Sequence, residues 1–186
     1  MIDPRSLQVS VCGVAELGTF RAAGVTHVLS LLDPGTPEPE AFSAFPPHAR
    51  ERLFFHDVID EFPGYDAPQR RHVEAVLAFG GTLPATAEGS AHVLVHCFMG
   101  ISRSTAAAAI LMAQASAGGE EEAFARLFAV RPRAWPNSRM ITLADGLLSR
   151  DGALTEALKR HQRRVIAAYP DIPDLVASVG RGHELP

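Results

Sequence analysis

The 186-residue sequence contains little cysteine and no excess of positive charge, and these two shortages exclude whole classes of protein. Two cysteines are too few for the disulfide framework of a small secreted domain. The 17 lysines and arginines are outnumbered by 21 aspartates and glutamates, which gives a formal net charge of −4. We therefore expect no general nucleic-acid footprint, and any positive potential has to be local.

Long hydrophobic runs are also missing. No stretch approaches the length that a membrane-spanning helix needs. Residues 1–10 include Asp3 and Arg5 and lack the apolar core of a secretory leader. We expect a protein without a membrane partner, with the cytoplasm as its default location, where a reactive thiol would stay reduced.

The composition that remains is that of an ordinary globular protein, with 47% hydrophobic and 20% charged residues. The length suits one domain over residues 1–186 with a substantial core. Residues 170–186 contain three prolines and little periodicity, so we expect a loosely packed tail there.

Strand and helix patterns alternate in the first hundred residues, and helices dominate afterwards. Strands are predicted at 7–12, 26–32, 52–58 and 91–95, and helices at 13–23, 69–83, 104–117, 120–130, 138–149 and 153–168. A short helix at 40–45 is weaker. This order predicts an α/β fold with a central, parallel-rich sheet flanked by helices.

One stretch, residues 96–104, carries most of the chemical information. It follows a buried apolar strand and opens into an alanine-rich helix, so it reads as strand, tight loop and helix. Such a loop can direct backbone N–H groups and a helix N-terminus at one anion. Cys97 and Arg103 lie at its two ends. A thiol in this setting favours the nucleophilic thiolate, and the guanidinium group fits two oxygens of a phosphate.

The order His-Cys, five residues, Arg and Ser resembles the signature loop of the cysteine-dependent protein tyrosine and dual-specificity phosphatases. The resemblance implies their phosphotyrosine phosphatase-like fold and a cysteinyl-phosphate intermediate on Cys97. Ser104 would hydrogen-bond the sulfur and help it leave, and His96 would organise the loop and help keep the thiol ionised. The phosphate would be bound by Phe98, Met99, Gly100, Ile101, Ser102 and Arg103. We call residues 96–104 the signature loop.

The same resemblance requires a general acid, which in the dual-specificity phosphatases is an aspartate that follows a strand thirty to forty residues before the cysteine. Asp57 matches best, because it follows the strand-like residues 53–56 directly. Asp60 and Asp66 lie in the same predicted loop and remain alternatives. Protonation of the leaving oxygen is worth about 10²–10⁴-fold in rate.

Two dipeptides beyond the signature loop extend the resemblance. Arg-Pro at 131–132 and Pro-Asn at 136–137 are similar to a family element whose asparagine, here Asn137, would brace the loop. The loop interior carries no Lys or Arg, which disfavours a lipid head group as substrate. The resemblance therefore implies a phosphorylated protein or a small aryl phosphate.

No cofactor or metal ion is implied. His92 and His96 lie on one side of a predicted strand, but two ligands without a clear third make a weak zinc site. Two other functions stay open: a rhodanese-like sulfurtransferase, which also uses a loop cysteine, and a phosphopeptide-binding module on a phosphatase scaffold. The oligomeric state, the physiological substrate and redox control of Cys97 do not follow from the sequence.

Overall fold

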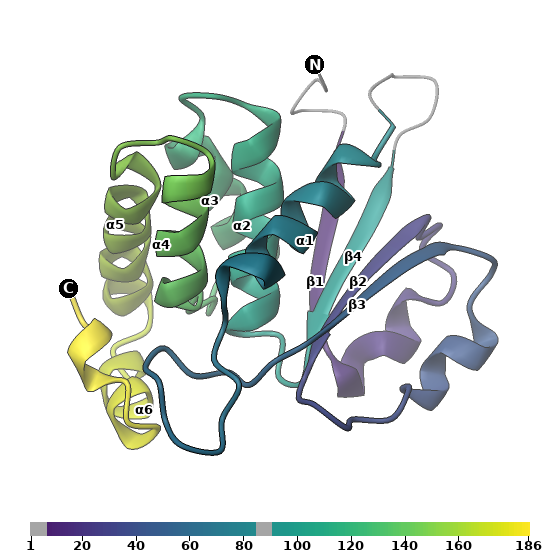
Figure 1. Ribbon diagram of the computed structural model, residues 1–186, viewed down its shortest axis with the longest axis horizontal. Helices are drawn as coiled ribbons and strands as arrows, with labels where there is room; N and C mark the ends of the chain where they lie inside the picture. Colours follow the sequence, from purple (N-terminus) through teal and green to yellow (C-terminus); the bar gives the residue numbers. More distant parts are fainter. Residues whose placement is uncertain (1–6, 85–90) are drawn as a thin grey trace.

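The computed structural model describes residues 7–84 and 91–186 (Figure 1). Residues 1–6, which belong to the stretch where we expect no secretory leader, lie outside the described residues. Within the two described ranges, no helix is both long and apolar enough to cross a membrane.

A four-stranded sheet forms the centre of the molecule, with the strand order β1-β4-β2-β3 and every neighbouring pair parallel. All six residues of β4 are buried, as expected for a parallel strand that is covered on both faces. This architecture confirms the predicted α/β class. The strands are β1 (Gln8–Gly13), β2 (His27–Leu32), β3 (Ala49–Phe54) and β4 (His92–Cys97).

Helices cover both faces of the sheet (Figure 1). On one face α1, α2 and α3 contact the strands, and α4 and α5 pack against α2 and α3 further out. On the other face, η1 and η2 enclose a smaller core. The helices are α1 (Arg70–Gly81), α2 (Arg103–Ala115), α3 (Glu120–Val130), α4 (Ser138–Leu147), α5 (Ala153–Ala168) and α6 (Ile172–Ser178), and the 3₁₀ helices are η1 (Val14–Phe20), η2 (Glu40–Ala44) and η3 (Gly182–Glu184).

Helix α2 lies at the centre of the main core. Every residue from Arg103 to Ala113 is buried. The run of four alanines at 106–109 has side chains small enough for the sheet and the neighbouring helices to approach closely. The helix that starts at the signature loop is therefore fixed by packing along most of its length.

Two predicted elements differ from the observed ones. The segment expected as a helix over 13–23 is the shorter 3₁₀ helix η1, where Thr19 Oγ1 donates to the Glu16 carbonyl at 2.7 Å and competes with backbone hydrogen bonds. Strand β3 lies at 49–54 rather than 52–58, because its partner β2 ends at Leu32, opposite Phe54. Asp57 therefore lies in the 55–69 loop, past the end of the strand.

The C-terminal segment, residues 169–186, forms α6 and η3 instead of the loose tail that we expected. Ile172 and Val176, one helical turn apart, are buried in a small core with Trp135 and Val165. This segment lies beside the 55–69 loop at the end of the molecule that carries the signature loop (Figure 1).

Candidate active site

The signature loop lies at the carboxyl edge of the parallel sheet, where α/β proteins place their ligands. Cys97 is the last residue of β4, the central strand, and Arg103 is the first residue of α2. Residues 98–102 turn the chain between them. The predicted order of strand, tight loop and helix is therefore observed.

The Cys97 thiol is buried within the loop, with 1% of the residue exposed. The Gly100 backbone N–H donates to its sulfur at 3.2 Å, and the Ser104 hydroxyl lies 3.2 Å from the same atom. Cys12, on the neighbouring strand, is equally buried, but burial raises the pKa of its thiol to about 12. The Cys97 sulfur thus has a backbone N–H and a hydroxyl group next to it, within the signature loop.

The backbone carbonyl groups of residues 98–102 all bind the surrounding protein. Phe98 O accepts from the Val14 N–H at 3.0 Å, and Ser102 O accepts from the Asn137 N–H at 3.3 Å. The remaining three oxygens are held by Arg131, which binds those of Met99 and Gly100, and by the Trp135 N–H, which binds that of Ile101.

This pattern orients the amide groups of the loop. In a trans peptide unit the N–H points opposite to the C=O, so carbonyl groups turned toward the scaffold leave the N–H groups turned toward the interior of the loop. Successive N–H groups that face one point form an anion-binding concavity. The structure therefore gives the signature loop the polarity that an oxyanion requires.

An ion pair braces the loop from outside. Arg131 donates to both carboxylate oxygens of Glu16, each at 2.9 Å, as well as to the loop carbonyls. Glu16 also accepts from the Gly13 N–H at 2.7 Å. The hydrogen bonds from Arg131 lower the pKa of Glu16, so the pair is charged at neutral pH.

Gly100 lets the loop approach β1 very closely. Its φ is +71°, and a Cβ atom at this position would lie 2.5 Å from the carbonyl carbon of Cys12 and from the nitrogen of Gly13. Any side chain would collide with backbone that cannot move aside. Glycine is therefore required here by both conformation and space.

Arg103 reaches back across the sheet edge and is 3% exposed. Its Nη1 donates to Asp33 Oδ1 at 2.6 Å and to the Phe55 carbonyl at 2.5 Å. Its Nε is buried and has no hydrogen-bond partner among the described residues. A buried donor of this kind is costly unless an acceptor binds it, and a phosphate oxygen is a suitable acceptor.

Asp57 is held against the signature loop through one of its two oxygens. Oδ1 accepts from Ser102 Oγ at 2.6 Å and from Asn137 Nδ2 at 3.0 Å, and Arg181 Nη1 lies 3.8 Å away. Oδ2 is 4.0 Å from Arg103 Nε. The carboxyl group thus lies between the loop and the guanidinium that would bind phosphate, and no hydrogen bond from the described residues reaches Oδ2.

The two alternative aspartates bind elsewhere. Asp60 Oδ2 lies 3.1 Å from His183 Nε2 in the C-terminal segment. The Asp66 carboxylate binds Arg71 and Gln69 at the start of α1. Of the three aspartates, Asp57 is the one that hydrogen-bonds the signature loop.

Asn137 and His96 differ in how they relate to the loop. Asn137 caps α4 by accepting from the Met140 N–H, and it donates to the Val58 carbonyl as well as to Asp57. His96 shares a hydrogen bond with Ser30 Oγ at 2.7 Å, so its ring is directed toward β2. Burial lowers the pKa of His96 to about 4, and the ring is neutral at physiological pH.

The sequence pattern does not assign four further residues to the site. Asp33 follows β2 directly, and its position at the carboxyl end of a strand next to β4 is a signal that could have identified it. Arg131 lies in the Arg-Pro pair, but this pair does not indicate that its side chain binds the carbonyl groups of the loop. Arg181 and Glu184 come from the C-terminal segment, where nothing in the sequence indicates a site.

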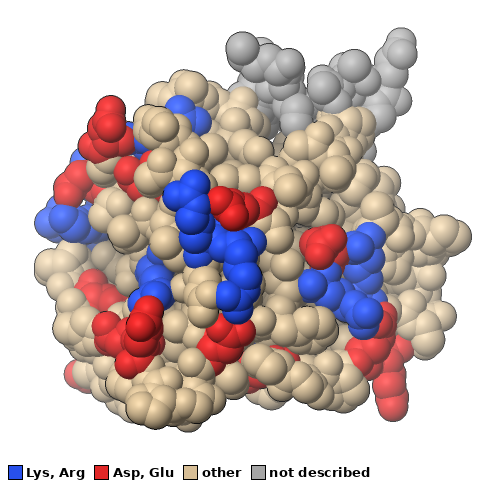
Figure 2. Space-filling view, viewed as in Figure 1, with Lys and Arg blue, Asp and Glu red and all other residues tan. Residues whose placement is uncertain are grey.

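Surface charge does not single out this region. On the face shown in Figure 2, basic and acidic side chains lie next to one another, with no broad area of one sign. Several basic side chains of the described residues form ion pairs, as in Arg70 with Glu74 and Arg139 with Glu61. The face in Figure 2 therefore provides no broad field of one sign.

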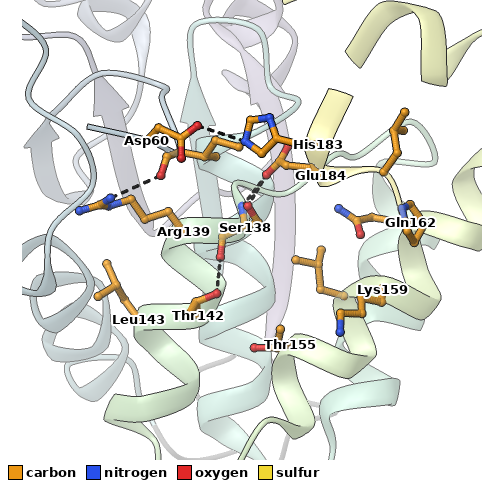
Figure 3. A pocket seen from close by; sticks show the side chains of 14 residues that line it. Asp60, Ser138, Arg139, Thr142, Leu143, Thr155, Lys159, Gln162, His183 and Glu184 are labelled. Carbon is orange, nitrogen blue, oxygen red and sulfur yellow. Dashed lines mark hydrogen bonds and ion pairs between the residues drawn. The ribbon is translucent and has the colours of Figure 1, made fainter. Parts of the chain in front are cut away.

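Two cavities adjoin the C-terminal segment. One, of about 370 Å³, is lined by Asp57 and by Met99, Ile101 and Ser102 of the signature loop. The other, of about 520 Å³, is larger but lies between α4, α5 and η3, and neither Asp57 nor any residue of the signature loop lines it (Figure 3). The smaller cavity is the one that continues the candidate active site.

Solved structures with a similar fold are phosphatases and phosphatase-like proteins. Human DUSP28 has a TM-score of 0.54 and 22% identity over 76% of this chain and 94% of its own. A mouse putative dual specificity phosphatase, solved with zinc tungstate, has a TM-score of 0.55 and 21% identity over 81% and 87%. The human tyrosine phosphatase-like serine/threonine/tyrosine-interacting protein has a TM-score of 0.53 and 18% identity over 76% and 88%.

The chain therefore has the fold of the cysteine-dependent tyrosine and dual-specificity phosphatases, and the resemblance read from the signature loop is confirmed at the level of the fold. No protein-family model matches the chain, and a comparison with curated protein sequences finds no match. At identities of 18–22% the likeness concerns architecture, so the chemistry has to be argued from the site.

Proposed function

We propose that this protein is a metal-independent phosphomonoester hydrolase that works through a cysteinyl-phosphate intermediate. Its substrates would be aryl phosphates, as phosphotyrosine in a protein or as a small molecule. The observation that carries the proposal is the convergence of Cys97, the inward amide groups of the signature loop and the unpartnered Nε of Arg103.

In the first step, Cys97 sulfur attacks phosphorus and the bond from phosphorus to the ester oxygen breaks. The loop amides and Arg103 stabilise the charge that develops on the phosphoryl oxygens. Asp57 gives its proton to the departing oxygen from Oδ2, since Oδ1 is occupied by Ser102 and Asn137. The products are a free phenol and phosphate bound to sulfur.

In the second step, water attacks the phosphorus of the cysteinyl-phosphate and the sulfur–phosphorus bond breaks. Asp57, now a carboxylate, takes a proton from that water. Ser104, with its hydroxyl 3.2 Å from Cys97 sulfur, donates to the leaving thiolate. Inorganic phosphate is released, and the Cys97 thiolate is restored.

The decisive experiment measures hydrolysis of para-nitrophenyl phosphate in excess chelator and fresh reductant. The native protein should turn over, and Cys97→Ser should lose at least about 10³-fold in kcat while still binding vanadate. Cys12→Ala is the matched control, because it removes the other buried thiol and should keep the activity. Turnover that survives in Cys97→Ser would contradict the mechanism.

The two other functions predict different results. A sulfurtransferase would move sulfur from thiosulfate to cyanide without hydrolysing the ester. A phosphopeptide-binding module would bind phosphotyrosyl peptides but show no turnover in either the native protein or the Cys97 variant. Either result would replace the hydrolase assignment.

A further inference from the structure

The cavity of about 370 Å³ beside the signature loop has an outer wall built by the C-terminal segment. Its inner wall is shared with the active site through Asp57 and the loop residues Met99 and Ser102. Asp57, the proposed acid, is among its lining residues, so the cavity lies beside the group that would accept the proton of Asp57. The outer wall consists of Ile172, Leu175, Val176 and Val179.

Large apolar side chains are exposed around this cavity. Met99, Leu175 and Val179 expose 60%, 46% and 64% of their surface. Exposed apolar side chains that gather around a hollow next to polar groups mark a binding surface. Trp135 adds an aromatic side chain to the lining and is almost fully buried.

The outer wall is fixed to the rest of the molecule by Glu184. This carboxylate accepts from Trp135 Nε1 at 3.0 Å, from Arg181 Nε at 2.6 Å and from the Ser138 hydroxyl. Figure 3 shows Glu184 directed at Ser138, with the neighbouring His183 joined to Asp60 of the 55–69 loop. The segment is therefore a formed wall rather than a loose end.

Polar groups in the cavity are few, and most are already bound. Asp57 and Ser102 bind each other, and Arg133 pairs with Asp171 outside it. Arg181 donates to Ser102 Oγ at 2.8 Å, while its Nη2 is buried without a hydrogen-bond partner in the described part of the chain. A peptide main chain brings one donor and one acceptor per residue, which this lining cannot satisfy. An apolar aromatic group with a single acceptor suits it better.

We infer that this cavity is a leaving-group subsite, built by the C-terminal segment, for aryl phosphates whose apolar ring system extends beyond the first ring. Arg181 Nη2 is the donor available to an acceptor on that group. The inference rests on the proposed function, because it assumes that the phosphate lies in the signature loop. It goes further by naming the substrate class and the residues that select it.

The test compares phenyl phosphate with 4-biphenylyl phosphate, whose leaving groups are similar in acidity but differ by one apolar ring. The native protein should prefer the biphenylyl ester by about tenfold in kcat/KM. A variant carrying Leu175→Ala and Val179→Ala should reduce the preference to about twofold and keep its rate on phenyl phosphate. Val130→Ala, which changes an exposed apolar residue on α3 outside the cavity, should retain the full preference.

Binding is measured separately in Cys97→Ser, using the fluorescence of Trp135, the one tryptophan of the chain. Biphenylyl phosphate should bind about tenfold more tightly than phenyl phosphate and should change this fluorescence. Equal kcat/KM values for the two esters, or an unchanged preference in the double variant, would overturn the subsite while the hydrolase stands. Tighter binding of the biphenylyl ester without turnover would support the subsite and overturn the hydrolase.

A phosphotyrosyl peptide with a leucine next to the phosphotyrosine serves as the rival substrate. If its kcat/KM exceeds that of the biphenylyl ester and falls in the double variant, the cavity takes a peptide side chain and the inference is overturned. Thermal unfolding of the double variant distinguishes a lost subsite from a lost fold, because Leu175 and Val179 are exposed and their truncation should leave the Tm close to native.

Discussion

The signature loop and the C-terminal segment meet at one site but are organised in opposite ways. The loop joins nucleophile, amide groups and guanidinium within residues 96–104, and the Gly100 N–H and the Ser104 hydroxyl both lie 3.2 Å from the Cys97 sulfur. The C-terminal segment reaches the same place through Arg181 and Glu184, and its wall is mostly apolar. The first region suits the reacting phosphate, and the second suits what the phosphate is attached to.

We expect substitutions in the signature loop to change the rate of the chemical step, and substitutions in the C-terminal segment to change the selectivity among substrates. Groups that bind developing charge act only in the transition state and lower kcat when removed. Groups that contact the remote part of a substrate change the ranking of substrates. Asp57, in the 55–69 loop, contacts both regions, because it binds the signature loop and lines the cavity.

The largest effect expected among the residues around the loop is that of Asp57→Asn. The variant should lose about 10²-fold or more in kcat on phenyl phosphate and much less on para-nitrophenyl phosphate, whose leaving group needs no proton. Steady-state kinetics on the two esters measure this. Asp60→Asn, the matched control, should behave like the native protein; if Asp60→Asn shows the selective loss instead, the acid is misassigned.

A smaller loss is expected when the brace of the loop is removed. Arg131→Met abolishes the bonds to the Met99 and Gly100 carbonyls and to Glu16, so the amide groups lose their fixed direction. We expect kcat to fall by about 10- to 100-fold, with weaker inhibition by inorganic phosphate. Arg160→Met removes an exposed arginine paired with Glu121 and should change neither value. A fully active Arg131→Met would show that the loop keeps its conformation without Arg131.

In the C-terminal segment, Glu184→Gln should affect stability more than chemistry. The substitution places an amide N–H₂ among donors that now bind a carboxylate whose side chain is 3% exposed, at a cost of about 1–3 kcal/mol. The Tm should fall by about 5 °C, and kcat on phenyl phosphate by less than tenfold. Calorimetry of Glu121→Gln, an exposed carboxylate, provides the control; an unchanged Tm in Glu184→Gln would mean that the wall is not anchored as described.

The last prediction concerns the pH dependence of stability rather than the chemical step. His96 binds a proton near pH 6.5 in the unfolded chain but only near pH 4 in the folded protein, because it is buried. The unfolded state therefore binds more protons in this window, and the free energy of unfolding falls as the pH is lowered from about 6.5 to about 4, by up to ~1.4 kcal/mol per pH unit for one group.

His96→Asn should reduce that dependence by up to one proton. Urea unfolding at several pH values measures the slope. His161→Asn should reduce it similarly, because burial also lowers the pKa of His161 to about 4. A native slope in His96→Asn would show that the His96 ring is not the group that titrates.

Most of the fold and the centre of the site could be predicted because their signals are local. Helices α3 and α5 begin and end where periodicity and flanking residues place them. The predicted range of strand β3 starts three residues late and ends four residues late, because the end of the strand is set by the end of β2 and not by its own apolar residues. A local sequence pattern therefore predicts the type of an element better than its boundaries, because a boundary can depend on the neighbouring strand.

The unpredicted parts of the site depend on contacts between distant segments. Arg131 binds Glu16 across a separation of 115 residues, and Arg181 binds Ser102 across 79. A single arginine in a polar stretch gives no sign of such a partner. The packing of α6 was also missed, because two apolar residues, Ile172 and Val176, are too short a pattern to distinguish a buried turn of helix from a loose end.

The long sequence separation between Arg181 and its partner also affects the order in which parts of the site form during folding. Its contact with Ser102 closes a sequence separation of 79 residues, and that of Glu184 with Trp135 closes 49. Contacts of such length form after local ones, and a ribosome delivers residues 181–184 long after the signature loop. In a growing chain, Cys97, the signature loop and Asp57 would therefore be in place before the subsite forms. Selectivity among substrates would be acquired last.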